Sequence, residues 1–352
     1  MTELLPFLKS LISIPGLSGF EAPVREKIVE AWRPLVNEIS ESPLGSLHAL
    51  RRGNAPAPRP RLLVMAHMDA IGLMVNGISG GFLHLTDIGG VDARILPGQL
   101  VTVHGRQDLP AVVAQPTNRL LPPGSSENAV GMDHLLIDTG LPPDQVMEMV
   151  NVGDRVSFAQ PPIDLGGDLL AGHSLDNRAS VAALTLCLEE LQTRIHAWDV
   201  WTVASVQEEE SLGGALTSPA QIRPDLAIAV DVTFAKGPGS NDYQALPLGK
   251  GVGLGWGPNI HPALYKTFKE LAERLEIPYK MEPLPYHSGT DAIGLQIAGE
   301  GIPCMVLSIP LRYMHTPVEV VSLKDIQRAG RLLAEFIARL DVDFMKNITW
   351  EA

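Results

Sequence analysis

The stretch Val200-Trp-Thr-Val-Ala-Ser-Val206, followed at once by Gln207-Glu208-Glu209-Glu210, decides the fold class of this chain. Its apolar part is short, rich in β-branched residues and bounded by polar ones, which is typical of a buried β-strand. Side chains alternate along a strand, so the adjacent carboxylates Glu208 and Glu209 are expected to point in different directions at its end. One could bind a metal ion while the other faces a water molecule or a substrate. A solvated acidic loop is the simpler interpretation of an isolated run of glutamates.

The composition is that of a globular protein without a nucleic-acid partner. The 352 residues suffice for one large or two ordinary domains, and 45% are hydrophobic and 19% charged. The net charge of −13 argues against nucleic acid, which needs basic patches. No run approaches the ~20 apolar residues that span a bilayer, and no signal-peptide pattern opens the sequence. Cys187 and Cys304 lie in apolar stretches and are expected to be core thiols of a reducing compartment, which predicts a cytoplasmic protein.

Buried strands that alternate with amphipathic helices predict an α/β fold with a mostly parallel sheet. A strand over 61–66 ends on His67-Met68-Asp69, and a strand over 226–230 ends on Asp231. Ligand sites of such sheets gather at the carboxyl ends of the strands. Other expected strands cover 36–40, 44–50 and 302–309, and helices are expected over 2–14, 22–32, 176–193, 262–275, 290–297 and 323–340.

Between residues 70 and 163 the pattern changes to short β-type runs separated by Gly, Pro and Asn. This predicts an all-β module over 70–163, inserted into a discontinuous α/β body over 1–69 and 164–352. The stretch 110–131 within the module is expected to be a long loop that is flexible or binds a partner. The expected strands of the module cover 72–75, 82–85, 99–103, 111–114 and 155–158.

Other polar residues stand at expected strand ends or before a helix, and each also has an ordinary interpretation. His67 could bind a metal ion while Asp69, two residues on and on the same side, accepts its other N–H. It could equally be a satisfied core or loop histidine. Asp176 could be a bridging carboxylate or an ordinary residue of a helix N-terminus. Asp231 could be a turn-initiating residue, and His315 a histidine of a surface loop.

Taken together, these groups favour a two-metal site, because they converge on one rim if their strands share a sheet. Two histidines with three carboxylates suit Zn²⁺, Co²⁺ or Mn²⁺. With one bridging carboxylate, such a set can hold two ions roughly 3.5–4 Å apart. The Glu208-Glu209 pair would supply one ligand and one base that moves the proton of an activated water. The sequence has no P-loop, no strand-flanked GxGxxG and no GxSxG, and neither cysteine has a catalytic partner nearby in sequence.

Six short motifs in this sequence resemble those of the co-catalytic metallo-aminopeptidases. That family includes glutamyl aminopeptidase, the self-compartmentalising tetrahedral aminopeptidases and proteins long mislabelled as cellulase M. The motifs appear in family order along nearly the whole chain. They are His67-Met-Asp69 with Ile71-Gly72, Leu175-Asp-Asn-Arg178, Gln207-Glu-Glu209, Val230-Asp-Val-Thr233, Gly289-Thr-Asp-Ala292 and Arg312-Tyr-Met-His-Thr-Pro-Val-Glu319.

The resemblance implies a set of metal ligands. Asp176 would bridge two divalent ions, Zn²⁺ or Co²⁺ with Mn²⁺ as a further possibility. His67 and Asp231 would complete one site, and Glu209 and His315 the other. It also implies that the inserted module is a dimerisation domain, and that dimers assemble into a hollow tetrahedral dodecamer that admits peptides.

The resemblance further implies that Glu208 is the general base, that Asp69 orients His67, and that Asp291 lies near the site in a role left open. Two departures from the family pattern, Ala70 and the stretch Glu210-Ser-Leu-Gly213, remove neither a proposed ligand nor the base, and the residues of the substrate pocket are not assigned. The expected function is removal of the N-terminal residue from unblocked peptides by a metal-activated water. Two alternatives stay open: a related two-metal deacylase or carboxypeptidase, and a catalytically silent paralogue that serves as a scaffold.

Overall fold

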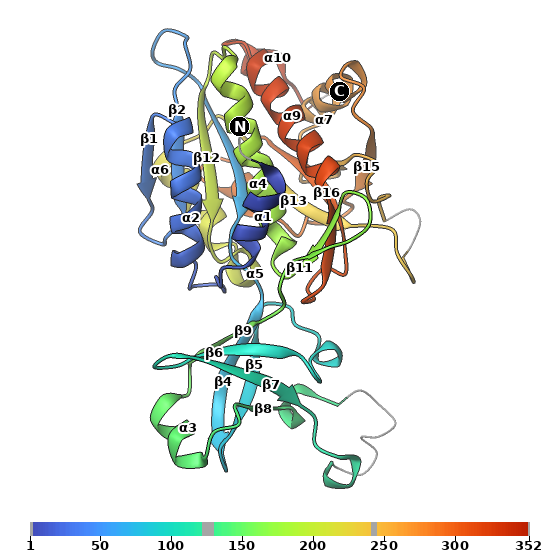
Figure 1. The fold of residues 1–352 in the computed structure, drawn as a ribbon. Helices are drawn as coiled ribbons and strands as arrows, with labels where there is room; N and C mark the ends of the chain where they lie inside the picture. Colours follow the sequence, from blue (N-terminus) through green and yellow to red (C-terminus); the bar gives the residue numbers. More distant parts are fainter. Residues whose placement is uncertain (1–2, 122–129, 241–244, 351–352) are drawn as a thin grey trace.

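The computed structural model describes residues 3–121, 130–240 and 245–350, which form a large α/β body and a separate β-barrel (Figure 1). Two crossings join them, one after β3 and one after β9. Each body has its own cluster of buried apolar side chains. No helix among the described residues is both long enough and apolar enough to cross a membrane.

Within the described residues, eleven strands of the α/β body form one mixed sheet in the order β1-β2-β12-β3-β13-β16-β17-β11-β10, with β14 pairing β15 and β16. The central strands β12, β3, β13 and β16 are parallel to one another, and their side chains are almost entirely buried. The strands are β1 Glu38–Glu41, β2 Leu47–Arg51, β3 Arg61–His67, β10 Ile163–Asp164, β11 Leu169–Gly172, β12 Asp199–Ser205, β13 Leu226–Phe234, β14 Val252–Trp256, β15 Tyr279–Pro283, β16 Cys304–Arg312 and β17 Glu319–Ser322.

Helices cover both faces of this sheet, which buries the apolar side chains of its central strands. Helices α1, α4 and α9 lie in front of the sheet in Figure 1, while α6 lies behind it and packs against α8. The α-helices are α1 Leu4–Ile12, α2 Ala22–Trp32, α3 Pro143–Met149, α4 Leu175–Glu190, α5 Glu208–Ser211, α6 Gly213–Ile222, α7 Pro262–Arg274, α8 Ala292–Ile297, α9 Leu323–Arg339 and α10 Phe344–Asn347. Short 3₁₀ turns are η1 Arg33–Leu35, η2 Ala93–Ile95, η3 Asn118–Leu120, η5 Met132–His134 and η6 Leu191–Thr193.

The inserted segment forms a closed barrel in the order β4-β5-β8-β7-β6-β9. All its strand pairs are antiparallel, and its interior is filled by aliphatic side chains such as Leu73, Val103 and Ile137. Closure leaves the barrel without an unpaired sheet edge. Its strands are β4 Gly72–Ser79, β5 Phe82–Ile88, β6 Leu100–His104, β7 Asp108–Ala114, β8 Leu136–Asp138 and β9 Arg155–Phe158.

Two sequence-based expectations are wrong in detail. Strand β12 ends at Ser205, and Glu208 and Glu209 open the short helix α5 rather than ending a strand, so side-chain alternation is not what separates them. The expected loop 110–131 begins inside β7, whose residues pair with β6 and β8. Residues 122–129 of that stretch lie outside the described residues.

Candidate active site

A cavity of about 780 Å³ opens at the carboxyl ends of the parallel strands. Ligand sites of open α/β sheets are found at this edge because loops leave the strands there. His67 ends β3, and Asp231 lies in the carboxyl-terminal half of β13. The structure brings together around the cavity all the ligand and base candidates of the sequence: His67, Asp176, Glu208, Glu209, Asp231 and His315.

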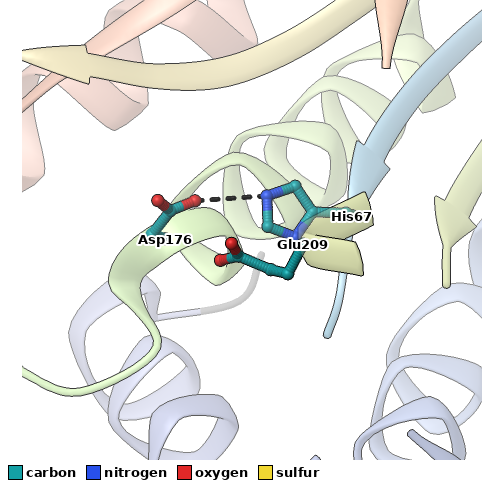
Figure 2. Close-up of side chains that lie close together, drawn as sticks. All are labelled: His67, Asp176 and Glu209. Carbon is teal, nitrogen blue, oxygen red and sulfur yellow. Dashed lines mark ion pairs between the residues drawn. The ribbon is translucent and has the colours of Figure 1, made fainter. Parts of the chain in front are cut away.

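Asp176 lies in the middle of this group, between the two histidines. Its Oδ1 is 3.1 Å from Nε2 of His67, and its Oδ2 is 3.6 Å from Nε2 of His315. Figure 2 shows the Asp176 carboxylate facing the His67 ring, with Glu209 beside them. Each oxygen of this one carboxylate therefore faces a different imidazole, which is the arrangement that a bridging ligand requires.

Each histidine has further carboxylates within reach. Nε2 of His67 lies 3.8 Å from Asp231 Oδ1 and 3.7 Å from Glu208 Oε2. Nε2 of His315 lies 3.3 Å from Glu209 Oε2. The adjacent residues Glu208 and Glu209 thus serve different halves of the site.

The start of α5 explains how two neighbouring glutamates reach different partners. Gln207 has a left-handed backbone, φ 57°, which turns the chain sharply after β12. The buried Asp69 carboxylate accepts the N–H of Glu208 at 3.1 Å on one oxygen and the N–H of Glu209 at 3.2 Å on the other. Ser18 Oγ also donates to Asp69 at 2.5 Å. Asp69 therefore fixes the backbone that carries both glutamates.

Asp69 is also close to the first histidine. Its backbone oxygen lies 3.3 Å and its carboxylate Oδ1 lies 3.4 Å from Nδ1 of His67. Asp291, in contrast, is not among the described residues that line the cavity: its Oδ2 accepts the hydroxyl of Ser205, the last residue of β12, at 2.5 Å. Burial raises the pKa of Asp291 to about 6.

Glu319 is a buried carboxylate beside the candidate site, and it stands in one of the six sequence motifs without an assigned role. It opens β17 and is buried. One carboxylate oxygen accepts the N–H of His315 and the other the N–H of Asp176, each at 3.0 Å. Glu319 therefore ties together two segments that lie far apart in the sequence. Its partners are backbone groups, so residue types alone gave no signal for this role.

The barrel loop that contains Gly89 and Gly90 contacts both His315 and helix α5. Nδ1 of His315 lies 3.1 Å from the backbone oxygen of Gly90, and Glu210 Oε1 accepts the N–H of Gly89 at 2.5 Å. A Cβ atom on Gly90 would come within 2.7 Å of His315 Nδ1. If Nδ1 donates to Gly90, Nε2 is left free toward Asp176 and Glu209. Glu210, which departs from the family pattern, thus connects α5 to the barrel.

The site gathers more negative charge than its histidines neutralise. Burial raises the pKa of Glu208 to about 9, and burial with the neighbouring carboxylates raises those of Glu209 and Asp231 well above the ordinary value. Burial alone would lower the pKa of His67, but the surrounding carboxylates, Glu208 first, raise it well above its ordinary value. Such a cluster fits divalent cations, whose charge favours the ionised carboxylates.

The donor set also has the chemistry of a metal site. His67, Asp176 and Glu209 each offer a ligand atom within 4.8 Å of the others. Imidazole nitrogens mixed with carboxylate oxygens suit Zn²⁺ and related first-row ions rather than soft metals that need thiolates. Cys187 and Cys304 are buried free thiols, and neither lines the cavity.

The chain is similar to known aminopeptidases. The family model M42 glutamyl aminopeptidase matches residues 45–332. The chain is 35% identical to the lysyl aminopeptidase of Pyrococcus furiosus, with 95% of this chain and 96% of that protein covered. It is 26% identical to the glutamyl aminopeptidase of Lactococcus lactis, covering 98% and 99%.

A solved structure has the same fold along the whole chain. The TET aminopeptidase of a marine-sediment archaeon of the Thaumarchaeota superposes with a TM-score of 0.93 at 30% identity, over 99% of each chain. The family that the six motifs predict is thereby confirmed. The chain belongs to the M42 glutamyl aminopeptidase family and is a peptidase, a hydrolase of peptide bonds.

Proposed function

We propose that this protein is a dinuclear metal-dependent aminopeptidase that removes the N-terminal residue from unblocked peptides. The observation that carries the proposal is the position of Asp176, whose two carboxylate oxygens face His67 and His315. Each of these histidines has a second carboxylate close by, Asp231 on one side and Glu209 on the other. A single-metal site would need no such duplication.

In this proposal each residue has one task. His67 and Asp231 would hold one divalent ion, Glu209 and His315 would hold the other, and Asp176 would serve as a ligand to both. Zn²⁺ or Co²⁺ suits the ligands, and Mn²⁺ is acceptable to them. When bound, the two ions polarise the carbonyl of the scissile bond and lower the pKa of a water molecule.

Glu208 is the proposed general base. It lines the cavity and lies 3.7 Å from Nε2 of His67, next to Asp176 and Asp231. Burial raises the pKa of Glu208 when no cation is present, and the positive charge of two bound ions would favour the ionised carboxylate, which is the form that accepts a proton. It would take a proton from water and give it to the leaving amine. Asp69 keeps Glu208 in place through the backbone N–H and also contacts His67.

The large-scale organisation is part of the proposal. We assign a catalytic domain to residues 1–69 and 164–352 and a dimerisation domain to residues 70–163, which contain the barrel. A TET peptidase of Pyrococcus horikoshii, TM-score 0.84 at 27% identity over 96% of this chain and all of that one, can assemble into a tetrahedron or a large octahedral shell. That likeness supports a homo-oligomer, a dimer or a tetrahedral dodecamer. Two buried free thiols support a cytoplasmic location.

A panel of free-amine and N-acetylated aminoacyl-p-nitroanilides tests the reaction. The protein is loaded with Zn²⁺, Co²⁺ or Mn²⁺ before the assay, and a parallel sample receives a chelator. We expect cleavage of the free-amine substrates alone, abolished by the chelator. N-acetylated amino acids are assayed in parallel, and their cleavage without cleavage of the free-amine panel would indicate a deacylase. If no substrate is cleaved while two metals are bound, the aminopeptidase proposal fails, and a scaffold paralogue is indicated.

A further inference from the structure

The cavity contains one more buried acidic side chain, Glu282 on β15. It is 8% exposed and lines the cavity together with Asp231. Its carboxylate accepts hydrogen bonds from the hydroxyl groups of Thr233 and Ser308. Across residues 3–121, 130–240 and 245–350, no lysine or arginine pairs with it. A buried carboxylate without a cationic partner is costly, so its place in a ligand cavity calls for a function.

The strand register places Glu282 beside the candidate metal ligands. Asp231 on β13 lies directly across from Ser308 on β16, and Thr233 follows two residues later on the same face. Two residues of a strand span about 6.6 Å. Because Glu282 bonds to both hydroxyl groups, its carboxylate lies about one side-chain length from Asp231. That separation matches the four-carbon stem that carries a lysine ammonium.

Apolar side chains line part of this cavity, and a glycine leaves room for the Glu282 carboxylate. Ala245, Leu284 and Val306 line the same cavity. Gly253 on β14 faces the acid, and a Cβ atom there would come within 3.1 Å of Glu282 Oε2. A cavity that combines apolar side chains with a buried acid suits a substrate side chain that has an aliphatic stem and a cationic end group.

We propose that Glu282 makes this cavity selective for peptides whose N-terminal residue has a cationic side chain, lysine above all. The inference rests on the proposed aminopeptidase function. A cationic side chain of the substrate would form an ion pair with the buried Glu282 carboxylate, whereas an uncharged side chain of the same shape would leave that carboxylate without a counterion. Burial raises the pKa of Glu282, the two hydroxyl groups oppose that shift, and an ammonium beside it would favour the ionised form further.

Arg312 offers the competing possibility, because it also lines the cavity. Its Nε donates to the backbone oxygen of Lys236 at 2.6 Å. Four residues of β16 separate Arg312 from Ser308, about 13 Å along the strand, so it lies toward the other end of the cavity from Glu282. A pocket governed by Arg312 would prefer an acidic N-terminal residue.

The test compares lysyl-, norleucyl- and glutamyl-p-nitroanilide on the metal-loaded protein. Norleucine has the stem of lysine without its ammonium. We expect kcat/KM for lysyl to exceed norleucyl by about tenfold or more, and Glu282→Gln to lower that ratio by about tenfold. Glu300→Gln, which removes an exposed carboxylate, should keep the wild-type ratio. Thermal unfolding and metal content of each variant show that it is folded and loaded.

Three outcomes overturn the proposal: an unchanged ratio in Glu282→Gln, a wild-type preference for norleucyl, or a wild-type preference for glutamyl, which would point to Arg312. Failure of the aminopeptidase function is distinguishable, since no free-amine substrate would then be cleaved. In that case, calorimetric binding of free L-lysine and L-norleucine tests the pocket without turnover. Tighter binding of lysine that is lost in Glu282→Gln would support the pocket, and equal binding would overturn it.

Discussion

Asp176 offers one carboxylate oxygen to each of two histidines, so the loss of either histidine should affect only half of the site. We predict that His315→Ala lowers the metal content from about two ions per chain to about one, because Glu209 and a single Asp176 oxygen hold an ion weakly. Elemental analysis of the purified variant measures this. His134→Ala, which changes a histidine of the barrel, should keep both ions. Unchanged metal content in His315→Ala would remove this residue from the ligands.

Glu208 should matter for turnover and not for metal binding. Glutamine has nearly the same shape as glutamate but cannot take the proton of a water molecule. We therefore predict that Glu208→Gln keeps both ions and lowers kcat by at least about 100-fold. Steady-state kinetics and metal analysis of the same preparation measure the two effects. A variant that turns over near the wild-type rate would refute the assignment of the base.

At the residue level, the sequence was sufficient to select six of the side chains that line the cavity, because their types and their places near the ends of predicted strands suit a metal site. Glu319 and Glu282 were not selected. Glu319 accepts hydrogen bonds from the backbone N–H groups of Asp176 and His315. Every residue type except proline has such an N–H group, so the sequence cannot indicate these partners. Glu282 becomes informative only once the register shows which residues surround it.

The loop after β5 should influence metal binding although it offers no ligand. The backbone oxygen of Gly90 lies 3.1 Å from Nδ1 of His315. A Cβ atom on Gly90 would come within 2.7 Å of the same nitrogen and would push the imidazole ring away. We predict that Gly90→Ala weakens metal affinity by about tenfold to 100-fold, as is usual when the partner of a metal-ligating histidine is disturbed. Competition with a fluorescent chelator measures the affinity.

The control for this variant is Gly166→Ala, since a Cβ atom on Gly166 meets no other atom within 4 Å. It adds the same methyl group at a site remote from His315. Wild-type affinity in Gly90→Ala would show that the barrel loop does not hold His315. Reduced affinity in both variants would point to a general effect of added methyl groups.

Helix α5 and strand β14 could not be predicted from the pattern of residues in the sequence. Helix α5 follows a left-handed turn at Gln207, whose N–H is held by Glu21 Oε1 at 3.2 Å, a contact between distant segments. Strand β14 carries Gly253 and Gly255, which weaken any strand pattern. Those glycines are required because side chains of β15 and β16 approach closely there. Long, periodic segments such as α2 and α9 were predicted within a few residues.

Acid should destabilise the whole molecule through its buried neutral histidines. His48 on β2 contacts Ser218 Oγ of α6 at 2.9 Å, and burial lowers its pKa to about 4. The unfolded chain therefore binds a proton that the folded protein does not between about pH 6.5 and 4. Stability consequently falls as the pH falls through that window, by up to about 3 kcal/mol for this group.

The variant His48→Gln isolates this contribution. Glutamine can still bond to Ser218 but does not titrate. We predict that its free energy of unfolding depends less steeply on pH than that of the wild type between pH 6.5 and 4. Urea unfolding at several pH values measures both slopes. Equal slopes in the two proteins would show that His48 is not buried in its neutral form.

On the scale of the molecule, the barrel and the α/β body meet at the site itself, through Gly89 and Gly90. The change from alternating α/β patterns to short β-type runs was enough to predict an inserted β module. It could not show that the module forms a closed barrel, because closure depends on pairs such as β4 with β9, whose strands are far apart in sequence. Nor did it show that a barrel loop reaches His315.

The measurement that tests the two-metal site most directly is turnover of a free-amine aminoacyl-p-nitroanilide as metal is added back to the chelated protein. The site built around Asp176 predicts that activity reaches its plateau at two ions per chain. Full activity with one ion per chain, or two bound ions without activity, would contradict it.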